Sequence, residues 1–526
     1  MRREQQTSRP EKRSNFFRGN NFPKLNRYSL LWIGMMAITG IIADGGENNP
    51  SAKLKALKIT DGKILSLKYD TSSTVVVNEK TAYKNLPPRT VVKLILHPAK
   101  GSNINVEIWL PNREKWNGRF LGTGTGGAAG HIRISPFTNI CAGYAVANTD
   151  MGTSPNSNSG IGNREVWKDF GFRATHLMTV VAKQIIKAYY GKDPEYSYFC
   201  GRSTGGQQAL QEAQRYPDDY DGILAEVPAH CRTPLHAYFL WNYQIFQECP
   251  FSDSQERNII DAANEYMAAR EVPQIAGKLV SDPRCTKRDI EAIIVLAREK
   301  DLTLTEKHVE ALRKLFDGPR HAVTGERIYG GIPVGASFKR AHSNSNLYLF
   351  KWVFGKSVDF MKINFGKDID RYTAELGPYL NAQNPDLSEF EKRGGKIIMF
   401  AGSADSCVPY HGSVDYYERV IGFFGSLNKV RSFFRFYIVP GMNHGLGQGI
   451  NRPLNINTLR KWREQSIVPD RIQARRIENG KTVIDIPLYP YPDKTVWKTK
   501  NGFERIQGPR GGTARIAERF LPSAEE

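Results

Sequence analysis

The chain has 526 residues, of which 40% are hydrophobic and 24% are charged. These values allow a large buried core, and they exclude a wholly disordered chain, a collagen, a coiled coil and a small disulfide-stabilised domain. The formal net charge is +20, but it is spread without a run of five or more like charges and without an RNA- or DNA-reading motif, so we expect no nucleic-acid partner.

The first 43 residues carry eight basic and two acidic side chains, and they end in the uncharged apolar stretch 28–43. This stretch is shorter than the roughly 20 residues of a membrane-spanning helix, and it fits the apolar part of a signal peptide. Ala43 suits a cleavage site, whereas Ile41 is bulky for its position. We predict that residues 1–43 are a signal peptide of a secreted or periplasmic protein. An uncleaved anchor, which alone would bring membrane contact, and a buried helix are the alternatives.

Short apolar segments alternate with segments of helical spacing through the first half of the chain. In order, we predict a β-rich region at 51–110, a buried strand at 144–150, a helix at 170–190, a strand at 196–200 and a helix at 207–216. Strands that are apolar along their whole length and are separated by helices indicate a mostly parallel sheet covered on both faces. The predicted fold class is therefore α/β.

The pattern changes near residue 226 and returns near residue 391. Helical stretches dominate at 254–270, 287–300 and 305–316, and buried strands resume at 396–400 and 434–439. We therefore divide the chain into a first core part (51–225), a mainly helical lid inserted into the fold (226–390), a second core part (391–500) and a poorly ordered tail (501–526).

Ser203 is the candidate nucleophile. It stands in the sequence Gly-Arg-Ser-Thr-Gly-Gly at 201–206, between a predicted strand and a predicted helix. A sharp strand–turn–helix connection exposes such a serine, and small neighbours let the two backbones pass. The N-terminus of the following helix also favours negative charge at this point. A structural glycine turn is the alternative.

Asp405 and His444 complete a candidate triad. Each follows a predicted strand, and the chain order Ser, Asp, His is the one found in α/β-hydrolases. The histidine would act as the base for Ser203, and the aspartate would orient it. Taken singly, a turn aspartate and a hydrogen-bonded structural histidine are the alternatives.

The glycine-rich loop at 122–130 is the candidate second half of an oxyanion hole. Such a hole needs one N–H from the residue after the nucleophile, here Thr204, and one from an early strand–helix loop, here Gly126 or Gly127. A phosphate-binding loop is the alternative, but the stretch lacks the Gly-Lys-Ser/Thr ending and has the wrong final glycine spacing.

Several strings together resemble the tannase and feruloyl esterase family, over about residues 103–495. They are WNGRFL at 116–121, GYA at 143–145 with TD at 149–150, DFGFRA at 169–174, STGGQ at 203–207, YPDDYDG at 216–222, PGMNH at 440–444 and PLYPYP at 487–492. The resemblance implies an α/β-hydrolase fold with a mostly parallel central sheet, and a large, mainly helical lid inserted between the nucleophile and the acid.

The sequence departs from that family at three places. The family usually carries a cysteine just before the serine and another just after the histidine, joined as a disulfide, whereas this chain has Arg202 and Gly445 there. Arg202 either attracts an acidic substrate or faces away from the site. Many relatives also carry an acid-rich calcium loop in the lid, but the matching stretch 267–284 has only two acids, Glu271 and Asp282. Because calcium requires several carboxylates, we expect no calcium there and no other cofactor or metal.

The predicted function is that of a serine carboxylic-ester hydrolase that acts through an acyl-enzyme. By resemblance, its substrates are small-molecule esters, or feruloylated or galloylated carbohydrates, whose acid is of the hydroxycinnamic or gallic type. Candidate ring contacts in the lid are Phe239, Trp241, Tyr243 and Phe246, for which core packing is the alternative. The competing functions are a catalytically inactive member that binds phenolic or carbohydrate ligands, and a serine peptidase or acyltransferase.

Overall fold

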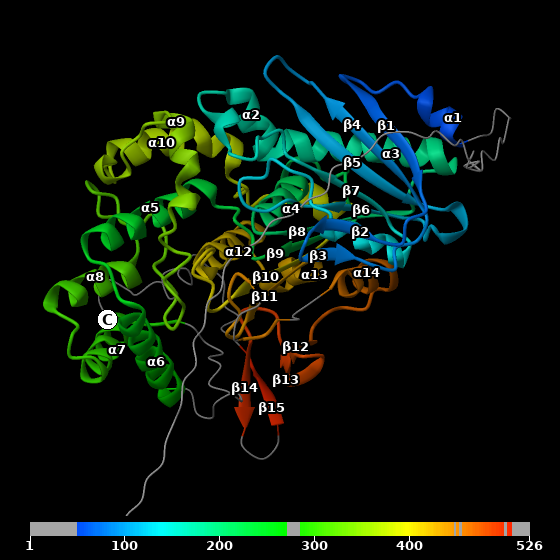
Figure 1. Ribbon diagram of the computed structural model, residues 1–526. Helices are drawn as coiled ribbons and strands as arrows, with labels where there is room; N and C mark the ends of the chain where they lie inside the picture. Colours follow the sequence, from blue (N-terminus) through cyan, green and yellow to red (C-terminus); the bar gives the residue numbers. More distant parts are fainter. Residues whose placement is uncertain (1–49, 271–283, 446–448, 452–454, 499–501, 508–526) are drawn as a thin grey trace, which may run out of the picture. The chain divides into compact units, whose positions relative to one another are not determined.

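The computed structural model describes residues 50–270, 284–445, 449–451, 455–498 and 502–507 (Figure 1). The predicted signal peptide at 1–43 and most of the stretch 267–284, where we expect no calcium, lie outside the described residues. Within the described residues, every helix is too short or too polar to span a bilayer.

Nine strands of the described chain form the central sheet in the order β1-β4-β5-β7-β6-β8-β9-β10-β11. Their bounds are β1 Gly62–Asp70, β4 Arg89–Leu96, β5 Ile104–Pro111, β6 Arg119–Thr123, β7 Ala145–Thr149, β8 Tyr196–Arg202, β9 Gly222–Glu226, β10 Lys396–Gly402 and β11 Phe434–Val439. The strands pair in parallel from β7 through β11, and β1, β4, β5 and β7 pair antiparallel. The predicted α/β fold with a mostly parallel sheet is confirmed.

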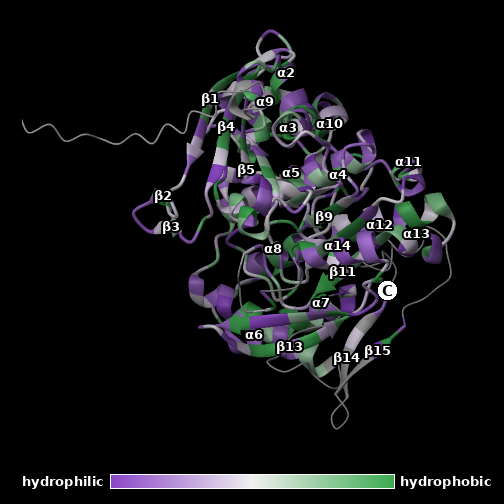
Figure 2. Cartoon of the chain, turned by 90° about the vertical axis from the view of Figure 1, so that its right-hand side faces the viewer, coloured by the Kyte–Doolittle hydropathy of each residue, from purple (hydrophilic) through white to green (hydrophobic). Residues whose placement is uncertain are grey.

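Both faces of the sheet are buried. Successive residues of a strand point to opposite faces, so alternate residues of one strand pack into different hydrophobic clusters. In β10, Ile397 and Met399 pack into one hydrophobic cluster, together with residues of α3 (Ala174–Tyr190), α4 (Thr204–Arg215) and α12 (Tyr410–Phe424). Ile398 and Phe400 pack into a second cluster with α14 (Ile456–Gln465). Hydrophobic and hydrophilic residues alternate around helices such as α6 and α12, as expected for helices with one buried face (Figure 2).

A mainly helical region interrupts the sheet between two neighbouring strands. β9 and β10 pair directly, with Gly222 opposite Lys396, so the residues between them leave the sheet and return to it. The helices of this region are α5 Arg232–Glu248, α6 Asp253–Arg270, α7 Lys287–Lys300, α8 Glu306–Asp317, α9 Tyr348–Phe354, α10 Lys367–Leu380 and α11 Ser388–Lys392. The predicted helices at 254–270, 287–300 and 305–316 are confirmed as α6, α7 and α8, and capping boxes begin α7 and α8.

The remaining α-helices and strands of the described chain belong neither to the nine-stranded sheet nor to the helical insertion. They are α1 Pro50–Lys55, β2 Val75–Asn78, β3 Thr81–Tyr83, α2 Arg164–Lys168, α13 Leu427–Phe433, β12 Ile472–Glu478, β13 Lys481–Leu488, β14 Lys494–Lys498 and β15 Gly502–Ile506. Three two-stranded antiparallel sheets join β2 to β3, β12 to β13 and β14 to β15 within the described chain.

The C-terminal boundary differs from the tail predicted at 501–526. Residues 502–506 form β15 and pair antiparallel with β14. The Arg505 guanidinium donates to carboxylates of Asp470 at 2.6 Å and Asp493 at 2.8 Å. These ion pairs join β15 to earlier segments of the chain. The polar sequence around residue 505 does not by itself indicate such contacts.

Candidate active site

Ser203 occupies a sharp turn between β8 and α4. Its backbone has φ 62° and ψ −117°, a left-handed conformation that costs free energy for a residue with a Cβ and that occurs mainly at functional sites. The Ser203 N–H donates to the carbonyl of Glu226 at 2.9 Å, which anchors the turn to the end of β9. A Cβ on Gly201 would overlap the carbonyl of Gly205. Glycine is therefore required at 201 for the strand and helix to pass.

Asp405 and His444 meet because β10 and β11 are neighbouring parallel strands whose carboxyl ends lie at one edge of the sheet. The His444 Nδ1 lies 2.8 Å from Oδ2 of Asp405. Asp405 is 0% exposed, and its Oδ1 accepts the backbone N–H groups of Cys407 at 2.8 Å and Val408 at 2.9 Å. The carboxylate is thus held in one position, and it orients the imidazole so that Nε2 is left for another partner.

A cavity of about 630 Å³ brings the candidate nucleophile and base together. Ser203 and His444 both line it, as do Gly126, Gly127 and Thr204. In the described part of the chain, no hydrogen bond joins Ser203 Oγ to His444; such bonds are often long in free enzymes and shorten when substrate binds. The volume is in the range of sites for small organic ligands.

The predicted oxyanion residues lie side by side. The Thr204 hydroxyl donates to the carbonyl of Gly127 at 2.7 Å, and Gly127 has φ +66°, a conformation that favours glycine. Among the described residues, the backbone N–H groups of Gly126, Gly127 and Thr204 have no hydrogen-bond acceptor. These three N–H groups are therefore available to a ligand in the cavity.

Arg232, which the sequence did not single out, connects the two halves of this predicted oxyanion hole. It is the first residue of α5 and is 3% exposed. Its guanidinium donates to Thr204 Oγ1 at 3.0 Å, to the Gly127 carbonyl at 3.4 Å and to the hydroxyl of Tyr348. All of these partners are neutral. The contact joins three segments that are distant in the chain, so no local pattern could have revealed it.

Arg202 lines the cavity, where it faces the carboxyl group of Glu226. The Arg202 Nε lies 4.0 Å from Glu226 Oε2, and the Arg202 side chain is 37% exposed. Burial raises the pKa of Glu226, and the Arg202 cation opposes that rise. The family's cysteine position is therefore occupied here by a cation at the site.

The loops that carry Asp405 and His444 are joined by hydrogen bonds. The Gly441 N–H donates to Ser403 Oγ at 2.7 Å, and the Ala404 N–H donates to the Met442 carbonyl at 3.1 Å. The Gly445 N–H is capped by Asn443 Oδ1 at 2.9 Å. The thiols of Cys141, Cys200, Cys231, Cys249 and Cys407 are free. Hydrogen bonds thus hold the His444 loop against the Asp405 loop, whereas positions 202 and 445 carry no cysteines to join the His444 loop to the Ser203 turn.

The lid contributes a different set of rings from the one expected. Of the four lid aromatics that the sequence suggested, Phe239 alone lines the cavity; Trp241, Tyr243 and Phe246 pack against other aromatic rings of the lid. Tyr348 and His236 line the cavity instead. Burial and the Arg232 cation lower the pKa of His236 well below its ordinary value, so its ring is neutral.

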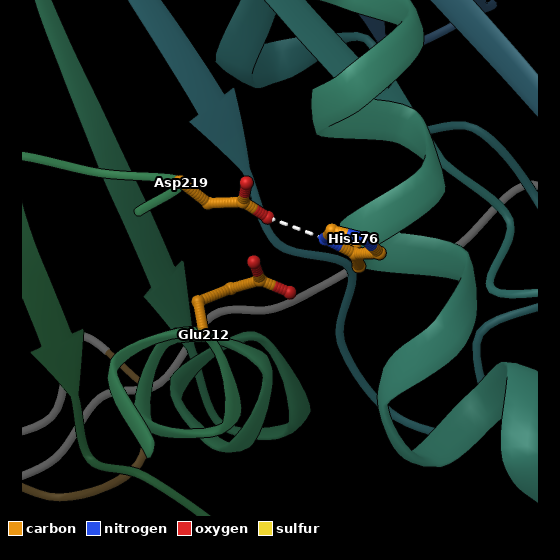
Figure 3. Close-up of side chains that lie close together, drawn as sticks. All are labelled: His176, Glu212 and Asp219. Atoms are coloured by element: carbon orange, nitrogen blue, oxygen red, sulfur yellow. Dashed lines mark hydrogen bonds and ion pairs between the residues drawn. The ribbon is translucent and has the colours of Figure 1, made fainter. Parts of the chain in front are cut away.

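Within the described residues, one group of three side chains could hold a metal ion: His176, Glu212 and Asp219 (Figure 3). His176 Nδ1 is already bonded to Asp219 Oδ2 at 2.7 Å. Glu212 is 1% exposed, and burial, together with the Asp219 charge, raises its pKa well above the ordinary value. A protonated Glu212 is neutral and needs no metal to offset a charge, although both of its carboxyl oxygens lack a hydrogen-bond partner among the described residues. None of the three lines the cavity.

Comparison with known proteins places the chain among esterases. A family model described as tannase and feruloyl esterase matches residues 90–369 and 356–508. An uncharacterised esterase of Xanthomonas campestris pv. campestris is 28% identical, covering 96% of this chain and 99% of its own. A probable feruloyl esterase of Arthroderma benhamiae is 27% identical, covering 88% of this chain and 94% of its own.

Two solved structures have a similar fold. Feruloyl esterase B from Aspergillus oryzae superposes with a TM-score of 0.75 at 22% identity, over 87% of this chain and 100% of its own. A tannin acyl hydrolase from Aspergillus niger superposes with a TM-score of 0.71 at 19% identity, over 88% of this chain and 95% of its own.

Proposed function

Since the chain belongs to the tannase and feruloyl esterase family and is a carboxylic ester hydrolase, we propose that it cleaves esters of hydroxycinnamic or gallic type acids through an acyl-enzyme on Ser203. The observation that carries the mechanism is the 2.8 Å hydrogen bond between His444 and a fully buried Asp405, at a cavity that Ser203 also lines. A serine held at φ 62° is the second support.

In the first half of the reaction, Ser203 Oγ forms a bond to the ester carbonyl carbon while Nε2 of His444 takes its proton. Asp405 keeps the Nδ1 proton in place and stabilises the imidazolium that forms. The intermediate then expels the alcohol, which receives the proton from His444. In the second half, His444 removes a proton from water, the water oxygen attacks the acyl carbon, and the acid leaves as Ser203 regains its proton.

The oxyanion of each intermediate would be bound by the N–H of Thr204 and by an N–H of Gly126 or Gly127. Each such donor contributes roughly 3–4 kcal/mol to transition-state stabilisation. Because Arg232 donates to the Thr204 hydroxyl and to the Gly127 carbonyl, it fixes the position of the Thr204 N–H relative to the glycine-rich loop. The N-terminus of α4 adds a favourable field.

The acid pocket would lie against the lid. Phe239 and Tyr348 offer rings, and Leu235 and Val408 offer apolar contact along the same cavity. A planar aromatic acid matches such a lining, since ring stacking adds to simple burial of apolar area. Aromatic esters, free or on carbohydrate, are therefore the proposed substrates.

We also propose that residues 1–43 direct secretion and are removed. The basic segment followed by the apolar stretch 28–43 supports this. N-terminal sequencing of the protein recovered from its native compartment tests the proposal, and an intact Met1 would exclude cleavage.

The test of the enzymatic proposal uses protein lacking residues 1–43, with methyl ferulate, methyl gallate and p-nitrophenyl acetate as substrates and Ser203→Ala as control. We expect hydrolysis that disappears in the Ser203→Ala protein, with the aromatic methyl esters preferred. A folded protein that hydrolyses none of the three and is not labelled at Ser203 by a fluorophosphonate would refute the proposal and favour a ligand-binding member of the family.

A further inference from the structure

The catalytic cavity has an excess of positive charge. Its lining includes four arginines, which are Arg133, Arg202, Arg232 and Arg340, against one carboxylic acid, Glu226. Burial raises the pKa of Glu226, which favours its neutral form and increases the excess. A methyl ester of a neutral phenolic acid has no charge to meet these arginines.

Within the described residues, three of the four arginines have no acidic partner. In the part of the chain that the structure describes, no carboxylate lies within ion-pair distance of Arg133, Arg232 or Arg340, whereas Arg202 lies 4.0 Å from Glu226. Arg133 contacts the Gly126 carbonyl at 3.4 Å, and Arg232 contacts only neutral oxygens. The excess charge is thus not neutralised by the described protein itself.

The burial of Arg232 makes this excess costly. A guanidinium that is 3% exposed has lost its hydration, and an unpaired buried charge is strongly unfavourable. Its Nε has no hydrogen-bond partner among the described residues. The neighbouring groups respond to the cation: it opposes the burial that raises the pKa of Tyr348, and it adds to the burial that lowers the pKa of His236. An anion entering this cavity would relieve the unpaired charge.

Arg133 and Arg340 supply the accessible guanidinium groups. Both are exposed, and they reach the cavity from different segments: Arg133 beside Gly126 of the predicted oxyanion loop, and Arg340 from the helical lid region. The Arg340 Nη2 lies 3.9 Å from the position of a Cβ on Gly445, next to His444. Guanidinium groups bind carboxylates through paired hydrogen bonds.

We propose that the preferred substrate is an ester that bears a second, free carboxylate group, and that Arg133 and Arg340 bind this group at the cavity while Ser203 attacks the ester. The inference rests on the proposed ester hydrolysis and specifies its substrate class. The field of the unpaired arginines, concentrated by the low-dielectric walls, also raises the rate of association of such anions.

The experiment compares two esters of the same shape: methyl 4-carboxycinnamate, which is anionic, and methyl 4-carbamoylcinnamate, in which a neutral amide replaces the carboxylate. We expect kcat/KM to be about 10-fold to 100-fold higher for the anionic ester, the range that a hydrogen bond to a charged group provides. This ratio should fall as salt is added, because screening weakens the attraction.

Two variants and one control assign the effect. Arg340→Gln and Arg133→Gln should each lower the ratio of kcat/KM for the anionic ester to kcat/KM for the neutral ester several-fold. The double variant should bring this ratio near one. Because the ratio is measured within each protein, partial loss of folded enzyme does not change it. Arg288→Gln, which removes an exposed charge on α7 that does not line the cavity, should leave the ratio and the activity unchanged.

A ratio at or below one in the unmodified enzyme, with the neutral ester hydrolysed, would overturn this inference and leave the proposed function intact. A ratio above one that survives in the double variant would overturn the assignment to Arg133 and Arg340. Absence of turnover on both esters, together with no fluorophosphonate labelling of Ser203, would remove the proposed function and this inference with it.

Discussion

Replacing Asp405 with asparagine tests the candidate triad at its best-defined contact. The Asp405 Oδ2 lies 2.8 Å from His444 Nδ1. At that distance, and with an effective dielectric constant of about 20, Coulomb's law gives roughly 6 kcal/mol between a carboxylate and the imidazolium of the transition state. A barrier raised by that amount corresponds to a decrease in kcat of about 10⁴-fold, which agrees with the effect of this substitution in serine triads.

The substitution also changes the tautomer of His444. The amide carbonyl of asparagine can still accept the N–H groups of Cys407 and Val408, which Asp405 Oδ1 now accepts at 2.8 Å and 2.9 Å. The amide NH₂ then donates to Nδ1, so the imidazole proton moves to Nε2. A protonated Nε2 cannot accept the proton of Ser203. We therefore expect little change in Tm and a large loss of kcat.

The assay measures kcat on p-nitrophenyl acetate and methyl ferulate, with Tm determined on the same preparation. Asp169→Asn is the matched control, because Asp169 is also 0% exposed but does not line the cavity. It accepts from Ser102 and Arg173, so its replacement should lower Tm and spare kcat. A triad aspartate replaced by asparagine should leave only about 10⁻⁴ of the kcat. A folded Asp405→Asn protein that keeps more than about a tenth of the kcat would therefore refute the assignment.

Three further predictions follow from the described contacts. Arg232→Met should lower kcat and the rate of fluorophosphonate labelling about 10-fold to 100-fold, because the Thr204 hydroxyl and the Gly127 carbonyl lose the guanidinium that connects them. A lower Tm with unchanged kcat and labelling would show a merely structural role. Burial raises the pKa of Glu212 well above its ordinary value, so its contribution to stability is full below the ordinary carboxyl pKa and is lost as pH rises through the folded value. The Tm of the natural protein should therefore fall, relative to Glu212→Gln, as the pH rises above the ordinary carboxyl range, because the amide of the variant stays neutral; parallel Tm curves would contradict this. Calcium and chelator should leave Tm unchanged, since residues 267–284 carry only two acids; a calcium-dependent rise that chelator reverses would show a site.

The elements were predictable where local sequence sets them. The strand at 434–439 is buried at nearly every position and agrees with β11 at both ends. Apart from Arg435, which pairs with Asp470, its side chains are apolar or aromatic, as expected for a strand covered on both faces. The Ser203 turn was predictable from its glycines, since a Cβ on Gly201 would overlap the carbonyl of Gly205 in the following helix. The order of Ser203, Asp405 and His444 along the chain then indicated which strand ends meet.

Arg232 shows where such reasoning stops. Nothing near residue 232 in the sequence distinguishes it from the other 72 lysines and arginines, and its position two residues before Pro234 predicts only the start of a helix. Its importance arises because α5 begins beside both Thr204 and Gly127, and that position depends on how the whole helical region returns to the sheet. The excess of positive charge in the cavity also depends on segments that are distant in the chain. Arg133 and Arg340 are further apart in sequence than the length of the first core part, and only the fold brings both to the cavity that Ser203 lines. The sequence therefore indicates the chemistry of the reaction, whereas the charge of the substrate it selects follows from the tertiary structure.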